Sequence, residues 1–140
     1  MLKALFFDLD GTLLTSGKAV SPSTLTALAD MKKRGLRLFI ATGRSPRLDM
    51  TLGWSADTLA LFDGGVFSNG ACVMLDGQPR WAHIAPEVVA ECVRLADHHG
   101  ARISLHMSDG CHAFNFVLPR SVWGPWGVTE ENVIPLDSAA

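Results

Sequence analysis

Two aspartates near the N-terminus, Asp8 and Asp10, are the residues best suited to chemistry. Side chains two positions apart in an extended segment point to the same side, so these carboxylates can converge where a strand ends. In open α/β sheets that end of a strand is where ligands bind. One carboxylate can attack an electrophile while the other carries a proton as acid and then base. A strand that ends in an acidic turn is the simpler alternative.

Two crowded carboxylates also favour a cation. The pKa of one of them rises unless a positive charge intervenes, and Mg²⁺ prefers oxygen ligands. Gly11 permits a backbone conformation that other residues avoid, and the Thr12 hydroxyl can stabilise the turn. The apolar run before Asp8, Leu5 to Phe7, fits a strand buried on both faces.

A second polar group follows the apolar run 36–41, which is predicted to be a strand. The Thr42 hydroxyl at the end of such a strand can bind a phosphoryl oxygen, and the amide of Gly43 can approach it closely. Arg44 either pairs with an anion or begins a loop. A βα turn that uses Thr and Gly for its own geometry is the alternative interpretation.

The residues between these two groups predict a helix. Ser21 and Pro22 form an N-cap followed by proline at the first helical position, and Gly35 fits the position after the C-terminus. Strand, helix and strand form a βαβ unit, so the two strands should be parallel and their carboxyl ends should meet.

The remaining elements alternate between short helices, strands and turns. Helical pieces are expected at 46–52 and 56–62, a turn at 63–65, a short strand at 66–68, hairpins at 72–83 and 101–118, and a helix that starts at Pro86. Regular structure is doubtful after Pro119, and residues 137–140 are expected to be a frayed tail.

The stretch Asp8-Leu9-Asp10-Gly11-Thr12 resembles motif I of the haloacid dehalogenase (HAD) superfamily. Ile40 to Arg44 is similar to motif II of its Cof-like subgroup with a type IIB cap, and Asn69-Gly70-Ala71 also resembles that pattern. The resemblance implies a Mg²⁺-dependent phosphatase of small phosphorylated metabolites. Asp8 would be the nucleophile that forms an aspartyl-phosphate, and Asp10 the general acid and base. Mg²⁺ would sit on the Asp8 carboxylate and the Asp10 carbonyl oxygen. The implied phosphate- and substrate-binding residues are Leu9, Gly11, Thr12, Thr42, Gly43, Arg44 and Asn69.

The fold class expected from this resemblance is α/β. Residues 1–83 would form part of a HAD-like core, with the first three strands of a parallel Rossmann-like sheet and a linker hairpin. Residues 84–140 would form an α+β part of a type IIB cap domain.

Only the first half of the family pattern is present. No lysine follows Arg44, and the late acidic residues lack the preceding apolar strand that the family's last motif requires. The strand at Leu5 to Phe7 would then lie at an exposed sheet edge, which favours self-association. We therefore expect a truncated chain that is weakly active or inactive alone.

Two other functions remain open. A phosphotransferase of the phosphomannomutase kind uses a similar Asp-x-Asp-Gly-Thr sequence. A non-catalytic fragment could instead act as a binding or oligomerising module through its exposed edge.

Composition limits the partners. A net charge of −2 gives no broad case for nucleic acid or a membrane surface, and no long apolar run indicates a membrane span. Three widely spaced cysteines fit reduced thiols in a cytoplasmic protein. His106 and His112 could face each other across a hairpin, either as a polar sheet face or as a metal pair.

Overall fold

A computed structural model describes residues 3–136, so the expected tail at 137–140 lies outside the described residues. The chain divides into two compact units, Met1–Ala82 and His83–Ala140. The first contains α1 (Pro22–Lys33), α2 (Leu48–Leu52), α3 (Ala56–Leu59), the turns η1 (Leu9–Leu13) and η2 (Ser68–Gly70), and the strands β1 (Ala4–Phe7), β2 (Arg37–Ala41), β3 (Gly64–Phe67), β4 (Cys72–Leu75) and β5 (Gln78–Trp81).

The five strands of the first unit form one sheet in the order β1-β2-β3-β4-β5. Strands β1, β2 and β3 are parallel, and β4 and β5 continue the sheet as an antiparallel hairpin. The α/β class and the three parallel strands are confirmed. Pro79 lies in β5, an outer strand of this sheet, where a residue without an N–H is tolerated.

Helix α1 begins and ends where its terminal residues indicate. The Ser21 hydroxyl accepts a hydrogen bond from the Thr24 amide at 3.1 Å, and Pro22 follows at the first helical position. Gly35, just beyond the helix, has a φ of 79°. Leu28 is the side chain that α1 buries, and the helix packs along β2. The crossover therefore brings the ends of β1 and β2 to one edge.

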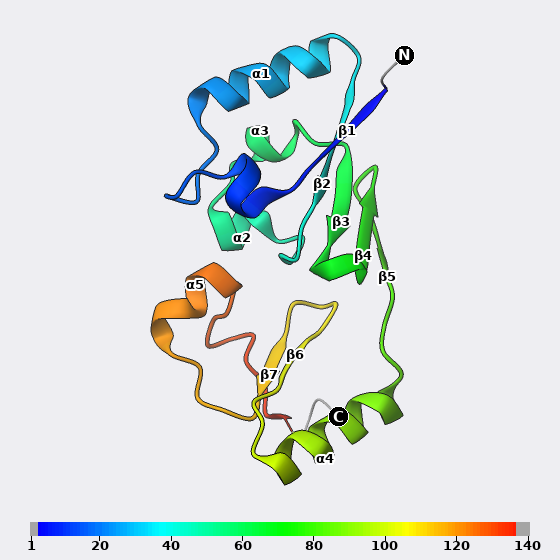
Figure 1. Cartoon of the computed structure of the whole chain (residues 1–140), viewed down its shortest axis with the longest axis vertical. Helices are drawn as coiled ribbons and strands as arrows, with labels where there is room; N and C mark the ends of the chain where they lie inside the picture. Colours follow the sequence, from blue (N-terminus) through cyan, green and yellow to red (C-terminus); the bar gives the residue numbers. More distant parts are fainter. Residues whose placement is uncertain (1–2, 137–140) are drawn as a thin grey trace. The chain divides into compact units, whose positions relative to one another are not determined.

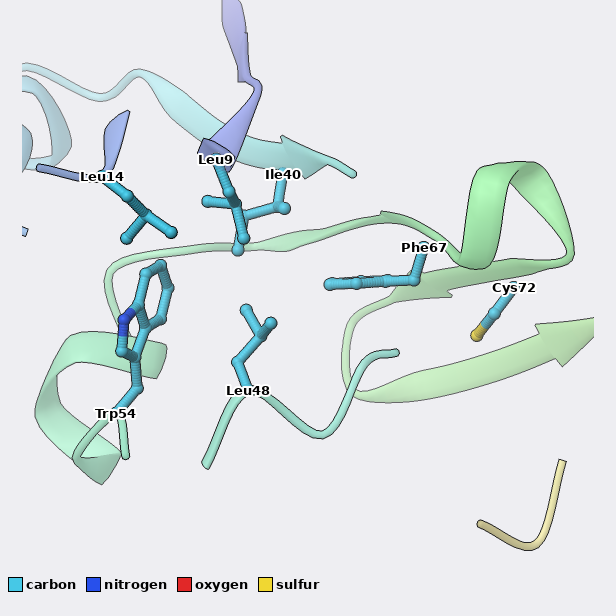
Figure 2. Close-up of a cluster of buried hydrophobic side chains, with 7 residues drawn as sticks. All are labelled: Leu9, Leu14, Ile40, Leu48, Trp54, Phe67 and Cys72. Carbon is cyan, nitrogen blue, oxygen red and sulfur yellow. The ribbon is translucent and has the colours of Figure 1, made fainter. Parts of the chain in front are cut away.

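The core of the first unit lies between the sheet and its short helices (Figure 2). Leu9 and Leu14 reach it from either end of the turn after β1, Ile40 from β2, and Leu48 from α2. Figure 1 shows α1, α2 and α3 on one side of the sheet, as expected when successive right-handed crossovers move in the same direction. The buried side of the turn after β1 thus fixes the position of the aspartates.

The expected turn at residues 63–65 is partly wrong, because Gly64 and Gly65 are the first residues of β3. Both stand in very close contact with neighbouring strands. A Cβ atom at Gly64 would lie 2.1 Å from the Met74 carbonyl oxygen, and one at Gly65 would lie 2.6 Å from that of Ile40. The glycines are needed for strand contact here, whereas in isolation they resemble a turn.

Strand β1 is not buried on both faces as its apolar run indicated. It pairs with β2 at the end of the sheet, and the Phe6 side chain is 62% exposed. The Phe6 ring stacks on Phe39 with centroids 4.9 Å apart. Both rings line a shallow apolar hollow with Val73 and Leu75 of β4. The prediction of an exposed edge at this strand is confirmed.

The second unit contains α4 (Pro86–His99), β6 (Ser104–His106), β7 (His112–Phe114), η3 (Arg120–Val122) and α5 (Trp123–Trp126). The strands are shorter than the expected 101–107 and 111–118. The Asn115 side chain accepts from the Ile103 amide at 2.8 Å and donates to the Ala101 carbonyl at 2.8 Å. These two bonds use backbone groups that would otherwise be available to pair with a longer β7. Short helical segments follow Pro119, and Val133 then forms an isolated parallel β-bridge with His112.

No helix within residues 3–136 combines the length and the apolar character that crossing a membrane requires.

Candidate active site at the carboxyl ends of β1 and β2

In the turn after β1, the polar side chains face solvent and an apolar side chain is buried. The backbone of Asp8 is extended. Two hydrogen bonds then close the turn, from the Leu13 amide to the Asp8 carbonyl (3.2 Å) and from the Leu14 amide to the Leu9 carbonyl (2.9 Å). Gly11 supports this wide turn at a φ of 79°, a region that L-residues avoid. Leu9 is fully buried between the two exposed aspartates. Its burial holds Asp8 and Asp10 at the surface.

The Asp8 carboxylate is exposed to solvent and bonded within its own turn. Its Oδ2 accepts a hydrogen bond from the Thr12 hydroxyl at 3.1 Å. A carboxylate can accept about four such bonds. Asp8 therefore keeps lone pairs for an electrophile or a metal ion, and Thr12 orients it as the turn residues predicted.

The Asp10 carboxylate, in contrast, is held by two cations. Arg44 donates from Nε to Oδ2 at 2.6 Å and from Nη2 to Oδ1 at 2.8 Å, and Lys18 donates from Nζ to Oδ1 at 2.6 Å. The hydrogen bonds from Arg44 first, and those from Lys18 second, hold the pKa of Asp10 well below its usual range. Asp10 is thus firmly ionised in this state. The pKa of the Arg44 guanidinium is raised by the same pair.

Arg44 reaches Asp10 from the loop that follows β2. The Thr42 hydroxyl accepts from the Arg44 amide at 3.2 Å, and the Thr42 amide donates to the Val66 carbonyl of β3 at 2.9 Å. Thr42 is buried, with 9% of its surface exposed. The loop is therefore tied to β3 on one side and to the β1 turn on the other.

Gly43 and Asn69 also come together, although they are far apart in the sequence. A Cβ atom at Gly43 would lie 2.8 Å from Oδ1 of Asn69. Asn69 has a φ of 54°, and the amide of Ser68 beside it donates to the Arg44 carbonyl at 2.9 Å. A side chain at position 43 would therefore require the Asn69 amide to move.

The expected site residues thus fall into two connected groups. One is the turn after β1, with Asp8, Leu9, Asp10, Gly11 and Thr12. The other is the loop after β2 with the turn after β3, which contribute Thr42, Gly43, Arg44 and Asn69. The bidentate contact between Arg44 and Asp10 joins them. Sequence reasoning missed Lys18, which lies in the loop before α1 and donates to Asp10.

A bound Mg²⁺ would find only part of a protein ligand set here. Within residues 3–136 no group of three or more His, Cys, Asp or Glu side chains could hold a metal ion. The hydrogen-bond partner of the Asp8 carboxylate is the neutral Thr12 hydroxyl, whereas the Asp10 carboxylate forms ion pairs with Lys18 and Arg44. Mg²⁺ is usually bound by one or two carboxylates together with water and substrate phosphate. Asp8 with a backbone carbonyl fits that minimal pattern.

Comparison with known proteins identifies the class of protein that this fold and site define. The profile of the haloacid dehalogenase-like hydrolases matches residues 5–123, so the chain belongs to that family. The Bacillus subtilis protein named "Putative phosphatase YkrA" is 44% identical over 100 residues, which cover 68% of this chain and 36% of that protein. Pyridoxal phosphate phosphatase YbhA of Escherichia coli is 48% identical over 42 residues, or 30% of this chain and 15% of the relative.

A solved structure shows the same fold. BT4131, a HAD subclass IIB sugar phosphatase, superposes with a TM-score of 0.73 over 98% of this chain and 54% of its own length, at 24% identity. The chain spans about a third of YkrA and about half of BT4131. The expected membership of the HAD superfamily is confirmed, and the chain shares part of the fold of BT4131.

Proposed function

We propose that this chain carries the nucleophile half of a phosphatase that acts on small phosphorylated metabolites. The observation that supports it best is the pair of exposed carboxylates at the end of β1, one free to attack and one held by Arg44. The names of the relatives support a phosphorylated substrate, as with the pyridoxal phosphate phosphatase YbhA. The reduced thiols of the described residues support a cytoplasmic location.

The reaction has two steps at the carboxylates. An Asp8 oxygen attacks phosphorus, the bond to the leaving oxygen breaks, and the leaving alcohol takes a proton from Asp10. Asp10 then takes a proton from water, which attacks the phosphorus of the aspartyl-phosphate and releases phosphate and free Asp8. The hydroxyl of Thr42 and the amide of Gly43 would bind the phosphoryl oxygens. Leu9, Gly11, Thr12 and Asn69 would shape the rest of the phosphate site.

Mg²⁺, when bound to Asp8 and the Asp10 carbonyl, would neutralise charge between the carboxylate and the phosphate. The described residues contribute few ligands for it, so we expect its affinity to be low.

Arg44 sets the protonation state in which Asp10 starts. The ionised Asp10 of this structure suits the second step, in which it acts as a base. The first step needs a protonated Asp10, so the guanidinium must release it. An incoming phosphate dianion competes for the same guanidinium, because Arg binds phosphate in bidentate fashion. Arg44 would then move from Asp10 to substrate, which agrees with its expected role as a phosphate ligand.

Labelling with acetyl phosphate and Mg²⁺ tests this proposal. We expect slow gain of one phosphoryl group at Asp8, detected by intact mass and peptide mapping of acid-quenched protein. Asp8→Asn should abolish the label. Asp10→Asn should leave it, because acetate leaves without a proton from Asp10, but should slow its loss. Asp49→Asn removes another exposed carboxylate paired with an arginine and should change neither. A label that survives Asp8→Asn would refute the nucleophile assignment. Fast hydrolysis of an aryl phosphate by the wild-type chain would refute its weak activity.

A phosphotransferase is the second candidate from the sequence. Sugar monophosphates added to the labelled protein separate the two activities. A mutase would pass the phosphoryl group to a sugar hydroxyl, whereas the proposed hydrolase would release inorganic phosphate.

The exposed end of the sheet supports self-association as a further property of this chain. Phe6 is 62% exposed on β1, and the apolar hollow beside it includes Phe39 and Val73. Two copies could pair their β1 edges, which would bring their exposed Phe6 side chains close together. Light scattering on the wild type should give a mass above the monomer that decreases with Phe6→Lys. Val117→Lys is a matched control, because Val117 is 94% exposed outside this face. A monomeric wild type would refute self-association.

A further inference from the structure

The two-stranded sheet of the second unit brings two histidines into direct contact. His106 of β6 and His112 of β7 are register partners across the antiparallel pair. Their Nδ1 atoms lie 2.8 Å apart, and their rings are inclined by 75°. One Nδ1 must therefore donate a proton to the lone pair of the other. This pair has no part in the chemistry proposed for Asp8 and Asp10.

The position of each ring differs in a way that suits ligation. His112 is 6% exposed and stacks on Phe114, whereas His106 is exposed and tilted against Trp126. Burial and then the charge of His106 lower the pKa of His112, and a hydrogen bond with the backbone of Gly127 opposes part of this shift. A histidine that ligates a metal usually has its other ring nitrogen fixed by such a hydrogen bond. His112 is thus a fixed ring, and His106 gives an ion access from solvent.

We propose that His106 and His112 form a two-histidine binding site for a divalent transition-metal ion, with Cu²⁺ and Ni²⁺ preferred over Zn²⁺. The ion takes the place of the proton now shared by the two Nδ1 atoms. The displaced proton moves to the other nitrogen of the exposed His106 ring, so the neutral pair releases no net proton. Water completes the coordination, because residues 3–136 contain no group of three or more side-chain ligands for a metal.

The distance between the nitrogens supports this order of metals. Metal–nitrogen bonds are about 2.0–2.1 Å long. Two nitrogens at right angles around such an ion are then about 2.8–3.0 Å apart, and two at the tetrahedral angle about 3.3 Å. The hydrogen bond holds the two nitrogens 2.8 Å apart, so the pair needs little opening to reach the spacing of adjacent positions around a square-planar or tetragonal ion and more to reach the tetrahedral spacing. Cu²⁺ and Ni²⁺ favour that geometry, whereas Zn²⁺ favours the tetrahedral one.

The charge near the pair also suits a cation. Asp109 in the connecting turn is the acidic group whose charge acts on His112, and it favours a cation. Neutral imidazoles are the form that binds a metal ion.

Calorimetric titration of the full chain with CuCl₂, NiCl₂ and ZnCl₂ tests the site. We expect one Cu²⁺ per chain, weaker Ni²⁺ binding and the weakest binding for Zn²⁺. His106→Ala should weaken Cu²⁺ binding by at least about tenfold, because the loss of even an outer partner of a ligand typically costs that much. His98→Ala with His99→Ala is the matched control, because these adjacent exposed rings of α4 have centroids only 4.7 Å apart.

Two further measurements test whether both histidines bind the ion. The spectrum of bound Cu²⁺ in electron paramagnetic resonance should show two equatorial nitrogens in the wild type and fewer in His106→Ala. The binding heat at pH 7.5 should be equal in buffers of different ionisation enthalpy. His112→Ala removes a buried ring and could unfold the unit, but His106 is exposed, so circular dichroism should show its variant folded. Equal Cu²⁺ affinity of His106→Ala and wild type, or an equal loss in the α4 control, would overturn the site.

Discussion

Arg44→Ala should destabilise the first unit by an amount that depends on pH. Arg44 makes two short bonds to the Asp10 carboxylate, and its side chain is only 16% exposed, whereas that of Asp10 is 39% exposed. Charge-assisted bonds of this kind contribute about 1.5–3 kcal/mol when sheltered, and fully exposed ion pairs about 0.2–1 kcal/mol. This pair lies between the two cases. We therefore expect a loss of about 1–2 kcal/mol in the free energy of unfolding near pH 7.

The pH dependence follows from the direction of the pKa shift. The pKa of Asp10 in the folded state is lowered, first by hydrogen bonds from Arg44 and then by those from Lys18. The stabilisation is then fully present above the unfolded pKa of about 3.9 and is lost as the pH falls below it. The difference in unfolding free energy between wild type and Arg44→Ala should be constant from about pH 5 to 8 and shrink progressively below about pH 4.

Urea unfolding followed by circular dichroism measures this difference, with Arg47→Ala as the matched control. Arg47 makes a similar fork on Asp49, but both bonds are 3.2 Å long and the side chains are 56% and 48% exposed. Its loss should cost about 0.2–1 kcal/mol at most. Arg44→Lys keeps the charge but not the fork and should recover only part of the stability. Equal losses of stability for Arg44→Ala and Arg47→Ala, or an Arg44→Ala loss of unchanged size at pH 3, would refute the stabilising ion pair between Arg44 and Asp10.

Two further predictions concern the packing of the first unit and its thiols. Gly65→Ala should cost about 2–3 kcal/mol in thermal or urea unfolding, because its Cβ would lie 2.6 Å from the Ile40 carbonyl oxygen. Gly17→Ala has room and should change stability by less than about 0.5 kcal/mol, and equal effects would contradict the strand contact. In a thiol-reactive dye assay, exposed Cys92 should react quickly and buried Cys72, whose pKa burial raises, only as the chain opens. A single fast phase for both thiols would show that the core is open.

Much of the fold follows from local signals at the ends of elements. Ser21 and Pro22 mark the start of α1, and Gly100 ends α4 with a φ of 62°. The turn between β4 and β5 uses Asp76 and Gly77, both at positive φ, as the Asp-Gly pair predicts. In these places the residue types alone determine the backbone conformation, so the sequence is sufficient.

Other features depend on partners that are distant in the sequence. Gly64 and Gly65 look like a turn until the neighbouring strands are present, because only then does the lack of a side chain allow close contact. Lys18 reaches Asp10 from a left-handed backbone position, with a φ of 60°. No pattern around Lys18 indicates this contact. A cation eight positions after Asp10, in the loop before α1, is the one signal that could have been weighed.

The paired histidines show the same limit in the second unit. Their facing positions could be foreseen from the hairpin around Asp109 and Gly110. The direct bond between His106 and His112 depends on ring orientation, which Phe114 and Trp126 help to set. Sequence spacing could therefore propose the pair but could not distinguish a polar sheet face from a chelating one.

The order of strands in the first unit has a consequence for how it is synthesised. Each strand from β1 to β5 bonds to the strand that precedes or follows it in the chain. A polypeptide that leaves the ribosome N-terminus first would therefore find each partner already present when the next strand emerges. The two parallel steps close connections of residues 8–36 and 42–63, the antiparallel steps close short turns, and within the described residues no strand of this sheet waits for the second unit. The sheet can grow in the direction of translation, with β1, which carries both aspartates, as its first strand.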